Sequence, residues 1–447
     1  MNALNAVLIS TYDLGRQPFG LASPAAWLRA AGVDVRCLDL AIQRIDEDAI
    51  RRADLVAFHL PMHTATRIAM RMVARVRAIN PDAVLCFYGL YAAMNETLLR
   101  RLGAAAVLSG EFEEALVALA LRVAQGAVPA TQDAPAISTS RLDFLVPDRG
   151  DLPPLSRYAR VVMPDGGERV TGYTEASRGC KHLCRHCPIV PVYDGLFRIV
   201  VPDVVLEDVN RQVAAGAEHI TFGDPDFLNA PRHTLEIVTR LHALHPDLTW
   251  DATIKVEHLL RHAQDLPRFA QLGCLFVTSA IESFDDRVLT ALDKGHTADD
   301  ALRVIALCRA SGLELNPTFV AFTPWTTRAS YARLLMILED NDLVDRVASI
   351  QLALRLLIPA GSRLLELKEV RLIARGFDEE ALVHPWSHED PGIDRLQKDI
   401  MAIVAAPVGG DRRERFASVA ALLGSRPRTA PLTSRAAIPF LTEPWYC

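Results

Sequence analysis

Three cysteines within eight positions carry the clearest chemical signal of the sequence. Cys180, Cys184 and Cys187 have the spacing C-x3-C-x2-C. Cysteine thiolates are strong, soft ligands for iron and zinc, and three of them on one short loop can hold a metal centre. In a [4Fe-4S] cluster, three thiolates bind three irons and the fourth iron stays open to another molecule. The loop therefore predicts a metal centre at which chemistry can take place.

Zinc is the alternative metal for this loop. A structural zinc needs a fourth ligand, which His182 or His186 could supply, but C-x3-C is a less usual zinc spacing than C-x2-C. We therefore expect an iron–sulfur cluster. The alternative function is a non-catalytic adaptor protein with zinc in a Cys3His site, and the metal content of the reconstituted protein separates the two.

Composition limits the classes of protein that remain. The chain has 447 residues, is 50% hydrophobic and carries a formal net charge of −6. This length predicts two or three domains, and the acidic balance makes nucleic acid an unlikely partner. The N-terminus lacks a secretory pattern, and no run approaches the roughly 18 uncharged apolar residues of a membrane span. We expect a cytoplasmic protein without a membrane partner, whose eight cysteines are mostly thiols.

Residues 1–127 alternate short apolar runs with helical patterns. The five strand-like runs are 6–9, 33–38, 55–58, 83–87 and 105–108. This alternation predicts a doubly wound parallel sheet, which binds ligands outside the carboxyl ends of its strands. No GxGxxG motif follows the first run, so a dinucleotide site is unsupported. Residues 128–168 are rich in proline, aspartate, serine and glycine and are expected to form a linker.

Residues 169–365 contain a second alternating region. Its six strand-like runs are 170–176, 219–222, 249–253, 275–279, 313–322 and 348–357. Six β/α units are too few for the closed barrel of eight, so we expect a partial (β/α)6 barrel. The cysteine loop follows its first strand, at the end where ligands bind. Residues 366–447 are expected to form a mostly helical C-terminal extension, with helices over 396–406 and 411–423.

The cysteine loop, together with motifs that follow it in order, resembles radical S-adenosylmethionine (SAM) enzymes. Arg178-Gly179-Cys180 through Cys187 is similar to their cluster loop, and Ser279-Ala280-Ile281-Glu282-Ser283 followed by Lys294-Gly295-His296 is similar to two later segments. The resemblance implies a [4Fe-4S] cluster that cleaves SAM reductively to a 5'-deoxyadenosyl radical. It also implies an electron donor such as flavodoxin or ferredoxin and a small-molecule or peptide substrate, with methyl transfer or sulfur, selenium or peptide modification as the reaction. The turn at 321–327 departs from the family pattern, so SAM contacts there are not expected.

The same resemblance assigns cofactor-binding residues. Gly223, Asp224 and Asp226 follow the second strand, where the family contacts the methionine amino group of SAM. Glu282 and Ser283 follow the fourth strand, where a carboxylate can orient the ribose or the SAM chain, and His186 takes the place of an aromatic side chain near adenine.

Simpler interpretations stand beside each of these assignments. Asp224 and Asp226 can form a turn and helix cap before Pro231. Glu282 can be a capping or ion-paired carboxylate, and His186 a surface histidine. Lys255, after the third strand, is expected to be a solvated charge. The cysteines of the apolar runs are expected to be buried structural thiols; they are Cys37, Cys86 and Cys274.

The first region resembles the cobalamin-binding domain that precedes many radical SAM domains. The segments 88–92 and 109–113 are similar to its recurring glycine and Gly-Glu-x-Glu turns. The DxHxxG motif that supplies a histidine to cobalt is absent. Many relatives hold cobalamin without that ligand, so cobalamin is a third candidate cofactor and remains open at this stage.

The last residue, Cys447, has two interpretations. It can be an incidental thiol on a disordered end. The arrangement as a whole also resembles the radical SAM group that has a Cys-Sec-Ala-Glu-Pro or Cys-Cys-Ala-Glu-Pro tail. Because the selenocysteine codon is ordinarily read as a stop, Cys447 would then be the first member of a truncated redox pair and a candidate catalytic residue.

Overall fold

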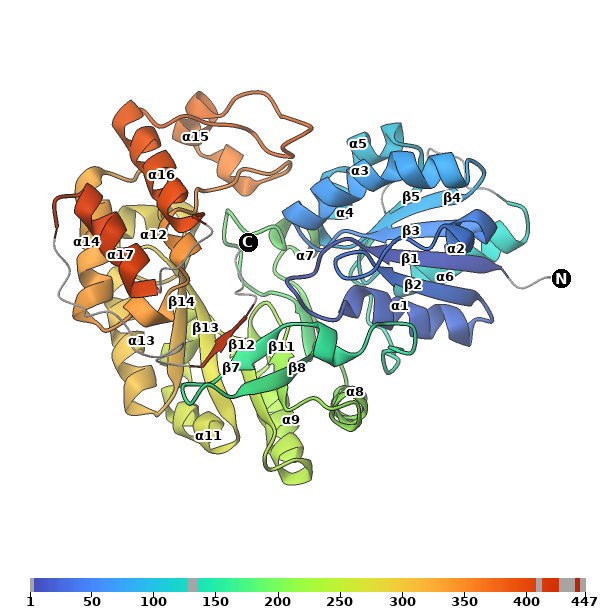
Figure 1. The fold of residues 1–447 in the computed structure, drawn as a ribbon, viewed down its shortest axis with the longest axis horizontal. Helices are drawn as coiled ribbons and strands as arrows, with labels where there is room; N and C mark the ends of the chain where they lie inside the picture. Colours follow the sequence, from blue (N-terminus) through green and yellow to red (C-terminus); the bar gives the residue numbers. More distant parts are fainter. Residues whose placement is uncertain (1–3, 128–135, 407–411, 426–438, 443–447) are drawn as a thin grey trace.

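The computed structural model describes residues 4–127, 136–406, 412–425 and 439–442. Two α/β halves lie side by side, and the C-terminal helices pack mainly on the second half (Figure 1). Cys447 lies outside the described residues. None of the helices in the described ranges is long and apolar enough to cross a membrane.

The first half is a six-stranded sheet whose strand order is β2-β1-β3-β4-β5-β6 and whose neighbours all run parallel. Its strands are β1 (Asn5–Ser10), β2 (Asp34–Asp39), β3 (Leu55–His59), β4 (Val84–Tyr88), β5 (Ala104–Gly110) and β6 (Ala136–Ser138). The five predicted strands and the doubly wound order are confirmed. The short sixth strand comes from residues that the sequence analysis assigned to a linker.

Helices cover both faces of this sheet, as its alternating apolar side chains require. The two on one face are α1 (Phe19–Ala30) and α6 (Glu113–Ala124). Those on the other are α2 (Glu47–Arg52), α3 (His63–Ile79), α4 (Leu90–Met94) and α5 (Glu96–Arg101). Cys37 and Cys86 are buried free thiols under the first pair, as predicted.

The second half is a curled sheet of order β14-β13-β12-β11-β8-β7-β15. Five neighbouring strands run parallel, namely β8 (Glu168–Thr174), β11 (His219–Phe222), β12 (Thr249–Thr253), β13 (Cys274–Glu282) and β14 (Glu314–Phe319). Two short antiparallel strands extend one edge, β7 (Arg160–Val162) and β15 (Phe440–Leu441). The α/β class and a partial barrel are confirmed, and Cys274 is a buried free thiol as predicted.

Helices follow the strands of the half-barrel in sequence order. They are α8 (Pro202–Ala214), α9 (Pro231–Leu244), α10 (Val256–Arg261), α11 (Leu266–Gln271), α12 (Asp286–Leu292), α13 (Ala298–Ala310) and α14 (Arg328–Asp340). The apolar faces of all but α12 share one core with the strands, and α12 packs in a separate cluster with residues such as Trp325 and Leu356. The carboxyl ends of the strands are thereby left free for the site.

The sixth barrel strand, predicted over 348–357, is reduced to a single parallel bridge between Phe322 and Arg355. Residues Ser349–Leu352 form a 3-10 helix instead. The side chain of Gln351 accepts the backbone N–H of Phe319 at 2.9 Å. The Gln351 side chain therefore takes the backbone N–H at the edge of β14 that a sixth strand would bond. The prediction of a full sixth strand was wrong for this reason.

The C-terminal extension is helical, as predicted. It contains α15 (Lys368–Ile373), α16 (Pro391–Val404) and α17 (Arg412–Leu422), and the last two pack into the barrel core. Between α15 and α16 the chain reaches back to the first half (Figure 1). There the carbonyls of Glu380 and Ala381 contact Arg67 and His63 of α3 at 3.2 and 2.6 Å. The extension thus bridges both halves beside the site.

Candidate active site

A cavity of about 510 Å³ separates the two halves. The carboxyl edge of the first sheet contributes residues such as His59 and Gly89 to its wall, and the mouth of the half-barrel contributes the cysteine loop and Glu282. Both edges are where parallel sheets bind ligands, so the fold brings two predicted ligand sites to one space.

All three predicted cysteines line this cavity. They follow β9 (Ser177–Gly179), which pairs with β10 (Phe197–Ile199), and precede the short helix α7 (Val190–Tyr193). Gly179 has φ of 75°, and a Cβ there would lie 2.5 Å from the Leu196 carbonyl oxygen, so only glycine fits at this turn. The thiols of Cys180 and Cys184 are buried, and none of the three is in a disulfide.

Two lysines supply positive charge to the cysteine loop. Lys255 is buried, and its Nζ lies 3.6 Å from Cys184 Sγ, so the prediction of a solvated charge was wrong. Lys294 is also buried and lies near the same thiols. Burial raises the pKa of Cys180 to about 11 and that of Cys187 to about 12, which means that these thiols ionise only with compensating charge. Three cavity-lining thiols with adjacent ammonium groups fit an anionic [4Fe-4S]–thiolate centre.

Glu282 ends β13 and faces the cavity. Its Oε1 lies 3.3 Å from Lys294 Nζ and 3.2 Å from His186 Nε2. Burial would raise the pKa of Glu282, but Lys294 and His186 lower it to about 2, so the carboxylate is ionised. Its φ of 69° at a β-bulge turns the side chain out of the strand register. The structure thus brings His186 and Glu282 together, and Glu282 is both ion-paired and cavity-facing.

Ser283 takes no part in the cavity wall among the described residues. Its Oγ accepts the backbone N–H of Asp285 at 3.1 Å and so shapes the turn into α12. Ser283 therefore has a structural contact in a turn, whereas its neighbour Glu282 faces the cavity.

Gly223 and Asp224 line the cavity at the end of β11. Asp224 accepts hydrogen bonds from Ser177 Oγ at 2.5 Å and from the Ala176 N–H at 2.9 Å. Burial raises the pKa of Asp224 to about 7. Burial is the largest effect on this pKa, and among the described residues no cationic side chain is one of its main causes. A cationic amino group entering the cavity would ionise it. Neither Asp224 nor Asp226 caps α9, so the helix-cap interpretation is not observed.

Asp226 lies behind the cavity wall, between two histidines. It is fully buried, and its carboxylate contacts His258 and His182 rather than the cavity. Burial would raise the pKa of Asp226, but the two imidazoles hold it below its usual value. Of the three residues that the sequence analysis assigned to SAM binding after β11, Gly223 and Asp224 therefore face the cavity and Asp226 does not.

Arg178 joins the two halves, a role that the sequence analysis missed. Its guanidinium lies 3.2 Å from Glu111, 2.8 Å from Glu113 and 2.9 Å from Glu175. Tyr193 donates a further hydrogen bond to Glu111 at 3.0 Å. The sequence analysis singled out the segments that contain Glu111 and Arg178, but these two residues are 67 positions apart and no local pattern predicts their ion pair. This buried network fixes the start of the cysteine loop against the end of β5.

The edge of the first sheet offers a neutral imidazole to the cavity. His59 ends β3, and burial lowers its pKa to about 3. Its Nδ1 is buried without a hydrogen-bond partner. Gly89, with φ of 109°, follows β4 and exposes bare backbone to the same wall. A neutral imidazole and a glycine without a side chain, both at the carboxyl edge of a parallel sheet, fit a large cofactor such as cobalamin.

Comparison with known families decides between the candidate classes. The family model of the radical SAM superfamily matches residues 174–326, and that of the B12 binding domain matches residues 6–120. The chain carries a radical SAM domain preceded by a B12-binding domain. A radical SAM domain implies a [4Fe-4S] cluster and SAM, and the B12-binding domain supports cobalamin as the third cofactor.

Solved structures share the arrangement of the two domains. The chain matches the radical SAM methyltransferase TsrM of Kitasatospora setae with a TM-score of 0.65 and 17% identity, over 81% of this chain and 75% of that one. It matches the cobalamin-dependent radical SAM enzyme OxsB with a TM-score of 0.70 and 13% identity, over 94% and 71%. These likenesses show a common fold for both domains.

A curated relative is similar over the central part of the chain. It is an uncharacterised methyltransferase of Pyrococcus horikoshii, 24% identical over 194 residues, which are 43% of this chain. The match spans 40% of the length of that relative.

Proposed function

We propose that the protein is a cobalamin-dependent radical SAM enzyme that transfers a methyl group to a small-molecule or peptide substrate. The observation that carries the proposal is the shared cavity, because the three cysteines of the radical SAM domain and the carboxyl edge of the B12-binding domain line the same space. When bound, the cluster and SAM supply a 5'-deoxyadenosyl radical, and cobalamin supplies a methyl carrier.

The chain's own residues have positioning roles in this proposal. Cys180, Cys184 and Cys187 hold the cluster, and the ammonium groups of Lys255 and Lys294 balance its negative charge. His59 and the backbone at Gly89 face the cobalamin side of the cavity.

The acids of the radical SAM domain orient SAM. Asp224 meets the α-amino group, because a carboxyl whose pKa lies near 7 ionises when a cation approaches. Glu282, which Lys294 holds ionised, accepts hydrogen bonds from the ribose hydroxyls or the SAM chain. His186, against Glu282, packs near the adenine. Gly223 lines the SAM side of the cavity at the end of β11, and the Tyr173 ring occupies the space that a side chain at this position would need.

Methyl transfer is favoured by the described functions of two similar proteins. TsrM, in the structure compared here, is a methyltransferase with tryptophan and a SAM analogue bound, and the Pyrococcus protein is named as a methyltransferase. An electron donor such as flavodoxin or ferredoxin in the cytoplasm would supply the reducing electron. Sulfur, selenium or peptide modification is the alternative reaction on the same cofactors.

The Cys3His zinc adaptor has no support in the structure. His182 lies against Asp226 and Glu257 and His186 lies against Glu282, so among the described residues neither imidazole pairs with the three thiols that it would have to join around one zinc.

Anaerobic reconstitution with iron, sulfide and hydroxocobalamin tests the proposal. We expect about four irons and one cobalamin per chain and, after dithionite reduction, formation of 5'-deoxyadenosine from SAM. Isotope label from the SAM methyl group should reach cobalamin. The variant with all three loop cysteines replaced by alanine is the control and should lose iron and 5'-deoxyadenosine formation. Colourless wild-type protein with one zinc and no iron would contradict the proposal.

A further inference from the structure

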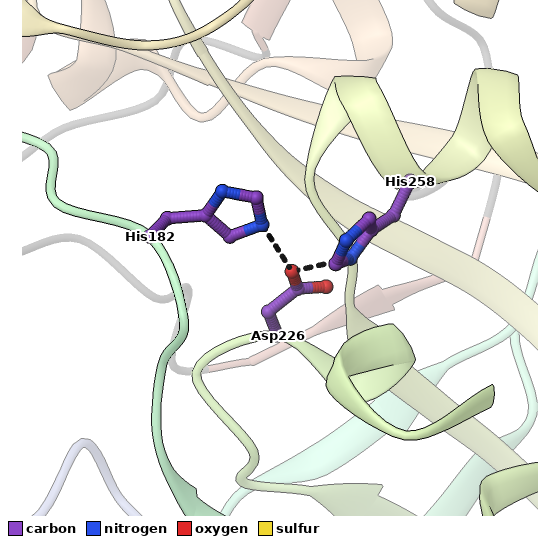
Figure 2. Close-up of side chains that lie close together, drawn as sticks. All are labelled: His182, Asp226 and His258. Carbon is purple, nitrogen blue, oxygen red and sulfur yellow. Dashed lines mark ion pairs between the residues drawn. The ribbon is translucent and has the colours of Figure 1, made fainter. Parts of the chain in front are cut away.

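A second group of metal-binding side chains lies behind the cysteine loop. His182, Asp226 and His258 each offer one ligand atom, and these atoms lie within 4.8 Å of one another. Asp226 Oδ2 is 2.6 Å from His258 Nδ1 and 3.5 Å from His182 Nε2. Figure 2 shows the carboxylate between the two imidazole rings. The three side chains come from the cysteine loop, the segment after β11 and helix α10.

The polar atoms that meet here are buried and lack hydrogen bonds. His182 Nε2, Asp226 Oδ2 and both ring nitrogens of His258 have no hydrogen-bond partner among the described residues. The side chains of Asp226 and His258 are 0% exposed. Buried polar atoms in folded proteins are almost always satisfied, so four in one place call for a physical explanation.

We propose that His182, Asp226 and His258 bind a divalent metal ion of the zinc class. Two imidazole nitrogens and one carboxylate oxygen suit Zn²⁺ and its first-row neighbours. Side chains that bind one ion lie next to each other with their ligand atoms directed at the ion and not at one another. This arrangement explains why Asp226 Oδ2 and His258 Nδ1 lie close together without the geometry of a hydrogen bond.

The spacing of the ligand atoms is close to that of a tetrahedral site. Ligands about 2.0 Å from zinc are separated from one another by roughly 3.3 Å. The 3.5 Å between His182 and Asp226 already matches this value. The 2.6 Å between His258 and Asp226 must widen when the ion enters, which a small rotation of the imidazole ring provides.

A second carboxylate supports the arrangement from behind. Glu257 Oε2 lies 3.6 Å from His182 Nδ1, the ring nitrogen that faces away from Asp226. A carboxylate at the far nitrogen of a metal-bound histidine fixes its tautomer and ring orientation. Glu257 therefore orients His182, and the fourth position of the ion is left to water.

The ion would fasten the cysteine loop to the barrel. His182 lies two positions from Cys180 and from Cys184, whereas Asp226 is in the segment after β11 and His258 is in helix α10 after β12. The inference goes beyond the proposed function, because cluster assembly and SAM cleavage involve other ligands.

Zinc binding to the full reconstituted chain tests the site. Iron and zinc are counted by mass spectrometry in the same anaerobic samples, and Zn²⁺ is titrated against a chromophoric chelator. We expect one zinc per chain in addition to the cluster iron. Asp226→Asn and His258→Gln should each lower the zinc affinity at least about 100-fold. His245→Gln is the matched control, because His245 directly follows α9 and pairs with Asn210 instead.

Co²⁺ gives a second readout, since tetrahedral nitrogen–oxygen ligation produces visible absorption bands that Asp226→Asn should abolish. Chain with the three loop cysteines replaced by alanine should still bind one zinc. The proposal is overturned if wild-type protein binds neither ion more tightly than about 1 µM, or if the zinc disappears together with the cysteines. Iron content and 5'-deoxyadenosine formation of the wild type are measured separately, so that outcome leaves the proposed function untouched.

Discussion

The ammonium of Lys255 lies 3.6 Å from the thiol of Cys184, inside the protein and at the wall of the cavity. A buried cation beside a cluster ligand stabilises the more negative, reduced state of the cluster, because hydrogen bonds and charge near the sulfurs set its potential. The relationship links a residue between β12 and α10 to the electron transfer that the proposed reaction needs.

Replacing Lys255 with methionine should therefore lower the reduction potential of the cluster. A charge-assisted hydrogen bond is worth about 1.5–3 kcal/mol, and about 59 mV corresponds to a tenfold change for one electron, so we expect a decrease of roughly 65–130 mV. Redox titration of the reconstituted protein measures it. Lys255→Arg keeps the charge and should stay near the wild-type value, and equal potentials in all three proteins would refute the role of Lys255.

Arg178→Met should destabilise the contact between the two halves. The substitution leaves Glu111, Glu113 and Glu175 buried without their cation, and removal of one partner from such a network costs about 3–5 kcal/mol. Thermal unfolding should shift down by several degrees. Arg240→Ala is the control, because its pairs with Asp203 and Glu236 are exposed and contribute little. Equal midpoints for both variants would show that the network carries no stability.

Glu282→Gln should weaken SAM binding at least about tenfold, since a neutral amide replaces the charged acceptor that Lys294 holds in the cavity. Equilibrium binding of SAM to the reconstituted protein checks this. Glu366→Gln, on an exposed carboxylate paired with Arg363, should leave the affinity unchanged. Wild-type affinity in Glu282→Gln, with the cluster intact, would remove Glu282 from the SAM site.

Asp224 gives a prediction about pH in the absence of SAM. Burial raises its pKa from 3.8 to about 7, so the folded protein keeps a proton that the unfolded chain has already released between those values. The carboxyl therefore costs stability increasingly as pH rises from 4 to 7, by about 4 kcal/mol in total at 1.4 kcal/mol per pKa unit.

Asp224→Asn cannot titrate and can keep both hydrogen bonds, to Ser177 and to the Ala176 N–H. Its stability relative to wild type should rise over that range and level off above about pH 7. Unfolding measured in parallel at several pH values gives the difference, and a constant difference would mean that Asp224 is ionised throughout.

Local patterns were sufficient for most of the strands and for the place of the three loop cysteines at the cavity. Apolar runs such as 55–58 predict strands because burial on both faces of a parallel sheet requires them, and three thiols on one loop stay together whatever the fold does. The sixth barrel strand failed for a specific reason, because the Gln351 side chain takes the hydrogen bond of Phe319 that a strand would make.

Long-range partners could not be predicted. The sequence predicts a solvated charge at Lys255, whereas in the structure Lys255 contacts Cys184. No sequence pattern near Arg178 predicts its ion pairs with Glu111 and Glu113. The sequence analysis considered His182 only as a possible zinc ligand of the cysteine loop, whereas its neighbours Asp226 and His258 come from the segment after β11 and from helix α10. Such pairings depend on the packing of whole domains, which spacing in the sequence does not record.

The most direct test of the central claim is electron paramagnetic resonance of the dithionite-reduced, reconstituted protein with and without SAM. The proposed function predicts the signal of a reduced [4Fe-4S] cluster whose shape changes when SAM is added, because SAM would bind the iron that a cluster held by Cys180, Cys184 and Cys187 leaves open. A protein without that signal, or with a signal that SAM does not alter, would contradict it.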